Sequence, residues 1–153
     1  MLEGRYEQFS SVITGIYRYI QKIERNEMIK YGYKGSYALY LMTMRRHPNG
    51  VTSAQLCELC DRDKAAVSRI ITEMKNKGLI CWENENESRY RARLMLTDEG
   101  KKAAEYVSGR AKAAAAIVNE KLDEEQRKAM YATLDLFSES LQNIVREGLP
   151  DFD

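Results

Sequence analysis

The residues whose types could do chemistry are concentrated on a single stretch, between positions 61 and 78. Small, hydroxyl-bearing and cationic side chains share one helical face there, namely Lys64, Ala65, Ser68, Arg69 and Thr72. Such groups can approach the base edges and phosphates of a nucleic acid. Ser68, Arg69 and Thr72 are expected to contact base edges or nearby phosphates, and Lys64 and Lys75 mainly to position the protein. The apolar residues recur on another face of the same helix, namely Val67, Ile70, Ile71 and Met74. The pattern predicts a helix with one side in a core and one side free to meet an anionic partner.

A two-stranded ribbon is expected directly after this helix. Gly78 tolerates the left-handed conformation that ends a helix. Residues 79–83 and 88–96 are typical of strands, with the polar run 84–87 as their turn. Alternation gathers the cations of the second strand on one face, namely Arg89, Arg91 and Arg93. A cationic ribbon beside a polar helix predicts binding to a duplex; the alternative is a set of solvated arginines that protects a strand edge from aggregation.

This stretch resembles a known family of proteins, the MarR-type winged-helix transcriptional regulators. The motifs that carry the resemblance are Asp63-Lys64, Val67-Ser68-Arg69, Lys77-Gly78-Leu79-Ile80, Arg89, Leu94, Leu96-Thr97 and Gly100. Several spaced elements agree in order and separation. The chain departs from the family at Ser88, where the family often has an aspartate, and at Ala65 and Ala66, which replace frequent hydroxyl residues.

The resemblance implies a mainly α fold with a small β-wing, in which a winged helix-turn-helix lies between N- and C-terminal dimerisation helices. We expect a single MarR-like domain over residues 1–153. Residues 33–96 would form the DNA-binding region, and residues 1–31 and 97–148 the dimerisation helices. The resemblance also favours entry of Arg89 into a minor groove. Arg91 is expected to contact phosphates or to be solvated.

Local signals give the boundaries of the helices. Apolar residues at 3.6-residue spacing predict a helix over 1–31, and a second helix is expected over 33–46, ended by His47-Pro48-Asn49-Gly50. A third should run from Ser53 to about Cys60. Capping residues mark the remaining starts, at Thr52 with Gln55, at Asp61 or Asp63, at Thr97, and at Asp123 with Gln126. The long terminal helices carry more apolar surface than a compact winged unit can cover, which predicts a homodimer.

Composition is that of a globular protein. Of the 153 residues, 44% are hydrophobic and 31% charged, and the net charge is +1. Residues 34–96 hold 11 Lys and Arg against 7 Asp and Glu, so the central third is basic and the flanks are acidic. This polarity would direct one surface toward phosphates, although a solvated face gives a similar count. No apolar run approaches the roughly 20 residues that span a membrane, and no signal peptide opens the chain, so a cytoplasmic location is expected.

Aromatic residues on the first two predicted helices suggest a small-molecule pocket. Tyr17, Tyr37 and Tyr40 could surround a crevice between the dimerisation helices and the DNA-binding region. The resemblance implies small aromatic or phenolic effectors in about that place. The alternative is that these tyrosines belong to the core, as aromatic residues at helical spacing more often do.

The cysteines allow three interpretations. Cys57 and Cys60 lie three positions apart on a predicted helix, Cys81 lies on a predicted strand, and His47 is the only histidine. Packing of buried thiols is favoured over redox sensing, and redox sensing over a zinc site, because zinc needs four close ligands. No metal and no cofactor are expected. Catalysis finds no support, since the chain has no nucleophile elbow and no phosphate-binding glycine loop.

These observations predict a homodimeric DNA-binding regulator of a palindromic operator. It would act as a repressor and be released by a small effector. The alternatives are a winged-helix protein-interaction module without DNA binding, favoured by Ala65, Ala66 and the acidic wing residues, and a thiol-based regulator.

Overall fold

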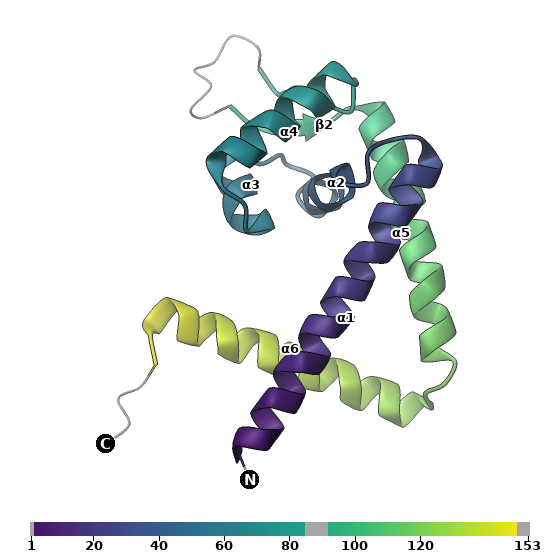
Figure 1. The fold of residues 1–153 in the computed structure, drawn as a ribbon, viewed down its shortest axis with the longest axis vertical. Helices are drawn as coiled ribbons and strands as arrows, with labels where there is room; N and C mark the ends of the chain where they lie inside the picture. The colour runs from purple at the N-terminus through teal and green to yellow at the C-terminus, as the bar shows by residue number, and fades with distance from the viewer. Residues whose placement is uncertain (1, 85–91, 150–153) are drawn as a thin grey trace. The chain divides into compact units, whose positions relative to one another are not determined.

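The computed structural model describes residues 2–84 and 92–149. The chain divides into two compact units, Met1–Lys112 and Ala113–Asp153. Figure 1 shows the order of the elements along the chain. Each unit is treated below by itself.

Helix α1 (Leu2–Tyr31) opens the first unit, as the apolar periodicity predicts. It ends in a Schellman motif at Gly32, whose φ is 111°. The Gly32 amide donates to the Ile29 carbonyl at 3.0 Å, and the Tyr33 amide to the Met28 carbonyl at 3.1 Å. Both bonds satisfy carbonyls that the last turn leaves open.

Three short helices follow: α2 (Tyr37–Arg45), α3 (Ser53–Cys60) and α4 (Lys64–Asn76). Helix α2 begins later than the predicted position 33, because a turn separates it from α1. Gly35 lies close to α1 in that turn, where a Cβ would come 3.2 Å from the Arg25 carbonyl oxygen. Helix α3 has the predicted bounds, and the capping box of Thr52 and Gln55 is present.

A small antiparallel sheet follows α4. It consists of β1 (Ile80–Trp82) and β2 (Leu94–Leu96), with Cys81 opposite Met95 in the register. Within the described residues both strands are shorter than predicted, because Leu79 and Glu83 lie outside β1 and residues 92–93 lie outside β2. The Glu83 amide still donates to the Arg93 carbonyl at 2.8 Å. A bridge from Val51 to Leu94 adds a third partner that the sequence did not indicate. Residues 85–91, which hold most of the predicted turn and the start of the second strand, lie outside the described residues.

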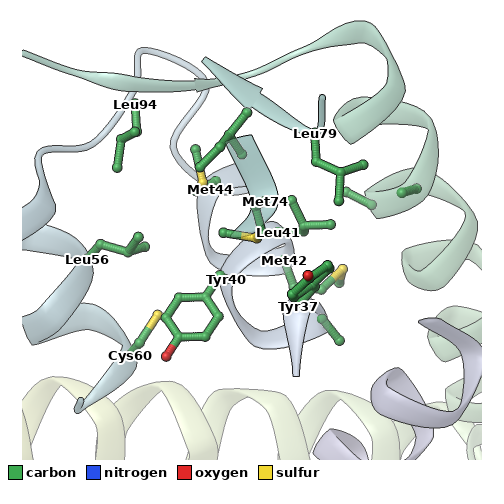
Figure 2. Close-up of a cluster of buried hydrophobic side chains, with 14 of the residues drawn as sticks. Tyr37, Tyr40, Leu41, Met42, Met44, Leu56, Cys60, Met74, Leu79 and Leu94 are labelled. Atoms are coloured by element: carbon green, nitrogen blue, oxygen red, sulfur yellow. The ribbon is translucent and has the colours of Figure 1, made fainter. Parts of the chain in front are cut away.

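The core of the first unit is formed by these helices and the sheet. Figure 2 shows side chains from α2, α3, α4 and the strands converging on one cluster. The fully buried members include Met28, Leu41, Leu56, Met74, Leu79 and Leu94. Helix α4 therefore rests on a closely packed base, which fixes the direction of its outer face.

Helix α5 (Asp98–Asn119) starts in the first unit, where Thr97 Oγ1 accepts a hydrogen bond from the Gly100 amide at 3.1 Å. This is the predicted cap. Buried Glu27 of α1 holds α5 by accepting a hydrogen bond from Arg110 Nε at 3.2 Å and from the Tyr106 hydroxyl at 3.4 Å. The polar network joins the C-terminal half of α1 to α5 within the first unit.

The second unit contains the end of α5 and helix α6 (Glu124–Glu147). Asp123 and Gln126 form the predicted capping box. Arg127 closes the connection between the helices, since its Nη2 donates to the carbonyls of Asn119 at 3.3 Å and Leu122 at 3.0 Å. No residue of α6 is buried within the chain.

The predicted fold class is confirmed: the protein is mainly α with a small antiparallel wing. Among residues 2–84 and 92–149, no helix combines the length and the apolar character that crossing a membrane requires.

Candidate nucleic-acid interface

Helix α4 presents the predicted polar face to the outside. Its apolar face is in the core, with Val67 1%, Ile71 7% and Met74 0% exposed, while Ile70 is half-buried. The side chains predicted to meet nucleic acid are all exposed, namely Lys64, Ala65, Ser68, Arg69, Thr72 and Lys75. The structure thus brings these residues together on one surface, because the same spacing that buries the apolar residues turns the others outward.

The N-terminus of α4 is capped by Asp63. Its Oδ1 accepts a hydrogen bond from the Ala66 amide at 2.8 Å. This confirms Asp63 rather than Asp61 as the cap; Asp61 instead ends α3 with a φ of 49°. The remaining amides of the first turn and the side chain of Lys64 form a positive helix end that suits a phosphate.

Ser68, Arg69 and Thr72 lie in the middle of α4. They differ in which of their side-chain donors and acceptors already have a hydrogen-bond partner within the chain. Thr72 Oγ1 donates to the Ser68 carbonyl at 3.1 Å, so its oxygen remains available as an acceptor. The guanidinium of Arg69 makes no ion pair within 4 Å in residues 2–84 and 92–149, although its charge helps to lower the pKa of Glu73. It therefore keeps its fork of donors for a partner, such as a guanine edge or a phosphate.

Glu73 is the carboxylate of α4, and it is turned toward α2. Its Oε2 accepts hydrogen bonds from Lys34 Nζ at 2.7 Å and from the Tyr37 hydroxyl at 3.0 Å. These bonds, with that from Lys34 the stronger, lower the pKa of Glu73 and keep it ionised. Sequence reasoning missed this contact, because the partners are 39 and 36 positions apart and carry no local pattern.

The C-terminal end of α4 is held by the start of α5. Gly78, with a φ of 71°, closes a Schellman motif in which the Leu79 amide donates to the Met74 carbonyl at 3.0 Å. Thr97 Oγ1 donates to the Gly78 carbonyl at 2.6 Å. Gly100 packs against the Leu79 carbonyl so closely that a Cβ there would overlap it. The helix is therefore fixed at both ends and at Glu73.

The wing is described only at its base. Arg89 and Arg91, which are predicted from the sequence to contact nucleic acid, lie outside the described residues. Arg93 is exposed, and its Nη1 donates to the Asn49 carbonyl at 3.0 Å. This bond ties the base of the wing to the turn after α2.

The tyrosines of the predicted effector pocket lie in different surroundings. Tyr37 is 2% exposed and Tyr40 4%, both in the core, whereas Tyr17 is 56% exposed on α1. Tyr40 also lines a hollow of about 140 Å³ between α1, α2 and α4. Gln21 lines the same hollow and donates to the Tyr17 hydroxyl at 2.7 Å, but Tyr17 itself is not one of the lining residues. Tyr37 is not one of its walls.

The cysteines are free thiols. Cys60 is buried beside Tyr40 (Figure 2), and its Sγ donates to Thr43 Oγ1 at 3.6 Å. Burial raises the pKa of the Cys60 thiol, which disfavours the reactive thiolate. Cys57 is half-buried and Cys81 exposed. Over the described part of the chain, no group of three His, Cys, Asp or Glu side chains could hold a metal ion.

Three short helices, a two-stranded wing and an exposed polar face on the last helix define a winged helix-turn-helix protein. Residues 31–85 match the model of the MarR family. The resemblance predicted from the sequence is thereby confirmed, and the fold is that of MarR family transcriptional regulators. A comparison with curated proteins gives no match.

Solved structures with this fold come from several organisms. A MarR transcriptional regulator from Methanosarcina mazei Go1 is similar with a TM-score of 0.76 at 24% identity, over 90% of this chain and 99% of that one. Staphylococcus aureus MarR, in complex with salicylate and kanamycin, has a TM-score of 0.74 at 19% identity, over 96% and 97%. A putative MarR family regulator from Listeria monocytogenes, complexed with 26mer DNA, has a TM-score of 0.72 at 17% identity, over 94% and 97%.

Proposed function

We propose that the protein is a transcriptional regulator that binds duplex DNA through α4. The main support for the proposal is the exposed face of α4, which gathers small, hydroxyl-bearing and cationic side chains. Hydrogen bonds at both ends of the helix hold this face in place. Ser68, Arg69 and Thr72 would contact base edges or nearby phosphates, with Ala65 allowing close approach. Lys64 and Lys75 would position the protein on the backbone. The DNA complex of the Listeria protein of similar fold supports this use of the fold.

Arg89 and Arg91 complete the proposed interface. Their place in the sequence, on the ribbon after α4, suits contact with a groove next to the one that α4 would enter. Arg89 would enter a narrow minor groove, where the negative potential attracts arginine. Arg91 would contact phosphates. Both assignments rest on the sequence.

The protein would act as a homodimer on a palindromic operator. Helix α1 exposes a line of apolar residues, with Val12 52%, Ile16 50% and Ile20 45% exposed. Helix α6 does the same, with Leu141 50% and Val145 87% exposed. Surfaces of this kind are costly to leave in water, and a second copy of the chain is the simplest cover. A two-fold dimer presents two copies of α4 to major grooves about 34 Å apart.

We further propose that the protein represses transcription and that a small effector releases it. The hollow lined by Tyr40 and Gln21 is the candidate place. Tyr17 would act through its hydrogen bond with Gln21, and Tyr37 through its hydrogen bond with Glu73. The salicylate and kanamycin complex of Staphylococcus aureus MarR supports small-molecule binding by this fold. The effector would act by favouring a dimer whose two α4 helices are wrongly spaced for DNA. Because its partner would be DNA, we propose that the protein acts in the cytoplasm.

The experiment that tests the proposal is a selection of bound fragments from genomic DNA with the full chain, followed by binding titrations over a range of salt concentrations. The expected result is an inverted repeat, bound by a dimer, with an affinity that falls as salt rises. Light scattering at micromolar concentration should give twice the mass of one chain. Failure to enrich any sequence, together with salt-independent or absent duplex binding, would instead favour the protein-interaction module.

A further inference from the structure

Two cations lie near the Glu73 carboxylate of α4. Lys34, in the turn between α1 and α2, donates to Glu73 Oε2 across 2.7 Å. Arg69 lies one helical turn before Glu73 on α4, and residues four positions apart are neighbours on a helix surface. The charge of Arg69 also contributes to the lowered pKa of Glu73, so the two side chains interact at a distance. Lys34 and Arg69 are therefore competing partners for one carboxylate.

The carboxylate of Glu73 is held by the residues outside α4. The Lys34 ammonium and the Tyr37 hydroxyl both donate to its Oε2. Of the two described cations, only Lys34 forms an ion pair with it. A pair between Glu73 and Arg69 would instead occupy guanidinium donors that contact with a base edge or a phosphate requires. The observed arrangement leaves those donors unused.

The backbone that carries Lys34 is fixed on both sides. The Lys34 carbonyl accepts a hydrogen bond from the Tyr37 amide at 3.0 Å, which closes the turn onto the start of α2. On its other side the turn lies against α1 at Gly35, where a Cβ would come 3.2 Å from the Arg25 carbonyl oxygen. Forming the pair with Glu73 therefore orders only the lysine side chain, which limits its entropic cost.

The alternative role for Lys34 is a direct contact with a DNA phosphate. The side chain of Lys34 is 63% exposed and that of Glu73 is 39% exposed, so both can be reached from outside. However, the ammonium is already neutralised by a carboxylate at 2.7 Å. A phosphate would have to displace that carboxylate, and a paired lysine adds little to counterion release. The geometry therefore favours a role that Lys34 performs through Glu73.

We propose that Lys34 is a positioning residue for the α4 interface: by holding Glu73, it keeps Arg69 free to bind DNA. The role rests on the proposed binding of duplex DNA by α4. Without the Lys34 ammonium, Glu73 would pair with Arg69, and the arginine would have to leave that pair before it met DNA. The released carboxylate would also repel the phosphates of the duplex. The Tyr37 hydroxyl carries no charge and cannot replace the lysine.

Operator binding by the full chain tests the role of Lys34. Lys34→Met removes the ammonium but keeps most of the side chain, and it should weaken binding roughly two- to threefold, the scale of one exposed ion pair. Lys34→Arg keeps a cation and should restore the affinity of the parent. Lys30→Met is the matched control, because Lys30 is 62% exposed and pairs at 2.6 Å with Glu27 of α1. Its operator affinity should equal that of the parent.

A double-mutant cycle separates this role from a direct phosphate contact. Glu73→Gln removes the carboxylate that would capture Arg69, so Lys34→Met should have little effect on affinity in the Glu73→Gln background. A direct phosphate contact predicts that the loss persists in that background and that the slope of affinity against salt falls by about one. Persistence of the loss, or an unchanged operator affinity in Lys34→Met alone, would overturn the proposal.

A measurement without DNA tests the competition inside the protein. The NMR signal of the Arg69 Nε–H group should shift in Lys34→Met and exchange more slowly with water, because the guanidinium gains a carboxylate partner. The signal should return to that of the parent when Glu73→Gln is added. Operator binding by the parent, together with an Arg69 signal that Lys34→Met leaves unchanged, would overturn this role of Lys34 alone. Absence of duplex binding by the parent would overturn the proposed function as well.

Discussion

The hydroxyl of Tyr37, a core residue of α2, donates a hydrogen bond to the Glu73 carboxylate of α4, with 3.0 Å between the two oxygens. The bond connects the inside of the first unit to the helix that carries the candidate interface. Tyr37→Phe should lower the free energy of unfolding by about 1 kcal/mol, because the variant lacks the hydroxyl and its hydrogen bond to a charged acceptor. Chemical denaturation of the two proteins measures the difference.

Two comparisons strengthen the Tyr37 measurement. Salt screens the exposed ion pair of Lys34 with Glu73. Lys34→Ala should therefore lower the free energy of unfolding by less than Tyr37→Phe, and this effect should fade as the salt concentration rises. Because the Glu73 pKa is lowered in the folded state, the contribution of these bonds should be present above about pH 4.5 and be lost on further acidification. An unchanged stability in Tyr37→Phe at pH 7 would contradict the role given to this bond.

Arg69 and Lys75 should affect DNA binding in different ways. Arg69→Ala should weaken binding to the selected operator by at least about 1 kcal/mol, roughly fivefold, since a bidentate base or phosphate contact is lost. Lys75→Ala should weaken binding to all sequences alike and reduce the slope of affinity against salt by about one. Fluorescence anisotropy with operator and unrelated duplexes separates the two effects. Lys22→Ala, an exposed lysine of α1, serves as the control. The same loss for every variant would show that α4 does not read the DNA.

Gly100 and Gly109 are a matched pair within α5. Gly100→Ala would place a Cβ against the Leu79 carbonyl and should cost about 2 kcal/mol or more in stability, because backbone must move. At Gly109 nothing lies within 4 Å of an added Cβ, so Gly109→Ala should stabilise the helix by up to about 1 kcal/mol. Thermal unfolding of both variants tests the pair. Equal effects would mean that the contact of Gly100 with Leu79 does not hold the end of α4.

The cap of α4 is a further test of how the interface is positioned. Asp63→Ala removes the acceptor of the Ala66 amide and should cost about 1 kcal/mol in the free energy of unfolding. Asp63→Asn keeps an acceptor and should recover most of it. Glu58→Ala changes an exposed carboxylate of α3 and should have little effect in the same denaturation assay. An unchanged free energy of unfolding in Asp63→Ala would contradict the role of Asp63 as the cap of α4.

Glu24 predicts an unusual dependence of stability on pH. Burial raises its pKa, and the charge of Arg46 lowers it only in part. A folded-state pKa above the unfolded value means that this group stabilises most at low pH and loses that contribution as pH rises through the folded pKa. Glu24→Gln should therefore raise the melting temperature at pH 7, by roughly 2 °C, and have no such effect at pH 4. Exposed Glu7→Gln is the control. A lower melting temperature for Glu24→Gln at pH 7 would contradict this sign.

Much of the fold follows from local pattern. The capping boxes at Thr52 and Asp123, the helix end at Gly78 and the two faces of α4 all depend on residues a few positions apart, whose geometry is set by the backbone itself. The delayed start of α2 and the short strands were less predictable. They depend on where neighbouring segments approach each other, as Gly35 approaches α1 and Val51 approaches Leu94.

The sequence by itself determined which side chains share the outer face of α4, because helical spacing alone separates Arg69 and Thr72 from Val67 and Met74. Only the tertiary structure decided how that face is held and which further sites exist. The contacts of Glu73 with Lys34 and Tyr37, and of Thr97 with Gly78, join positions far apart in the chain. Such contacts depend on packing, in which many side chains settle together, and no local spacing encodes their outcome.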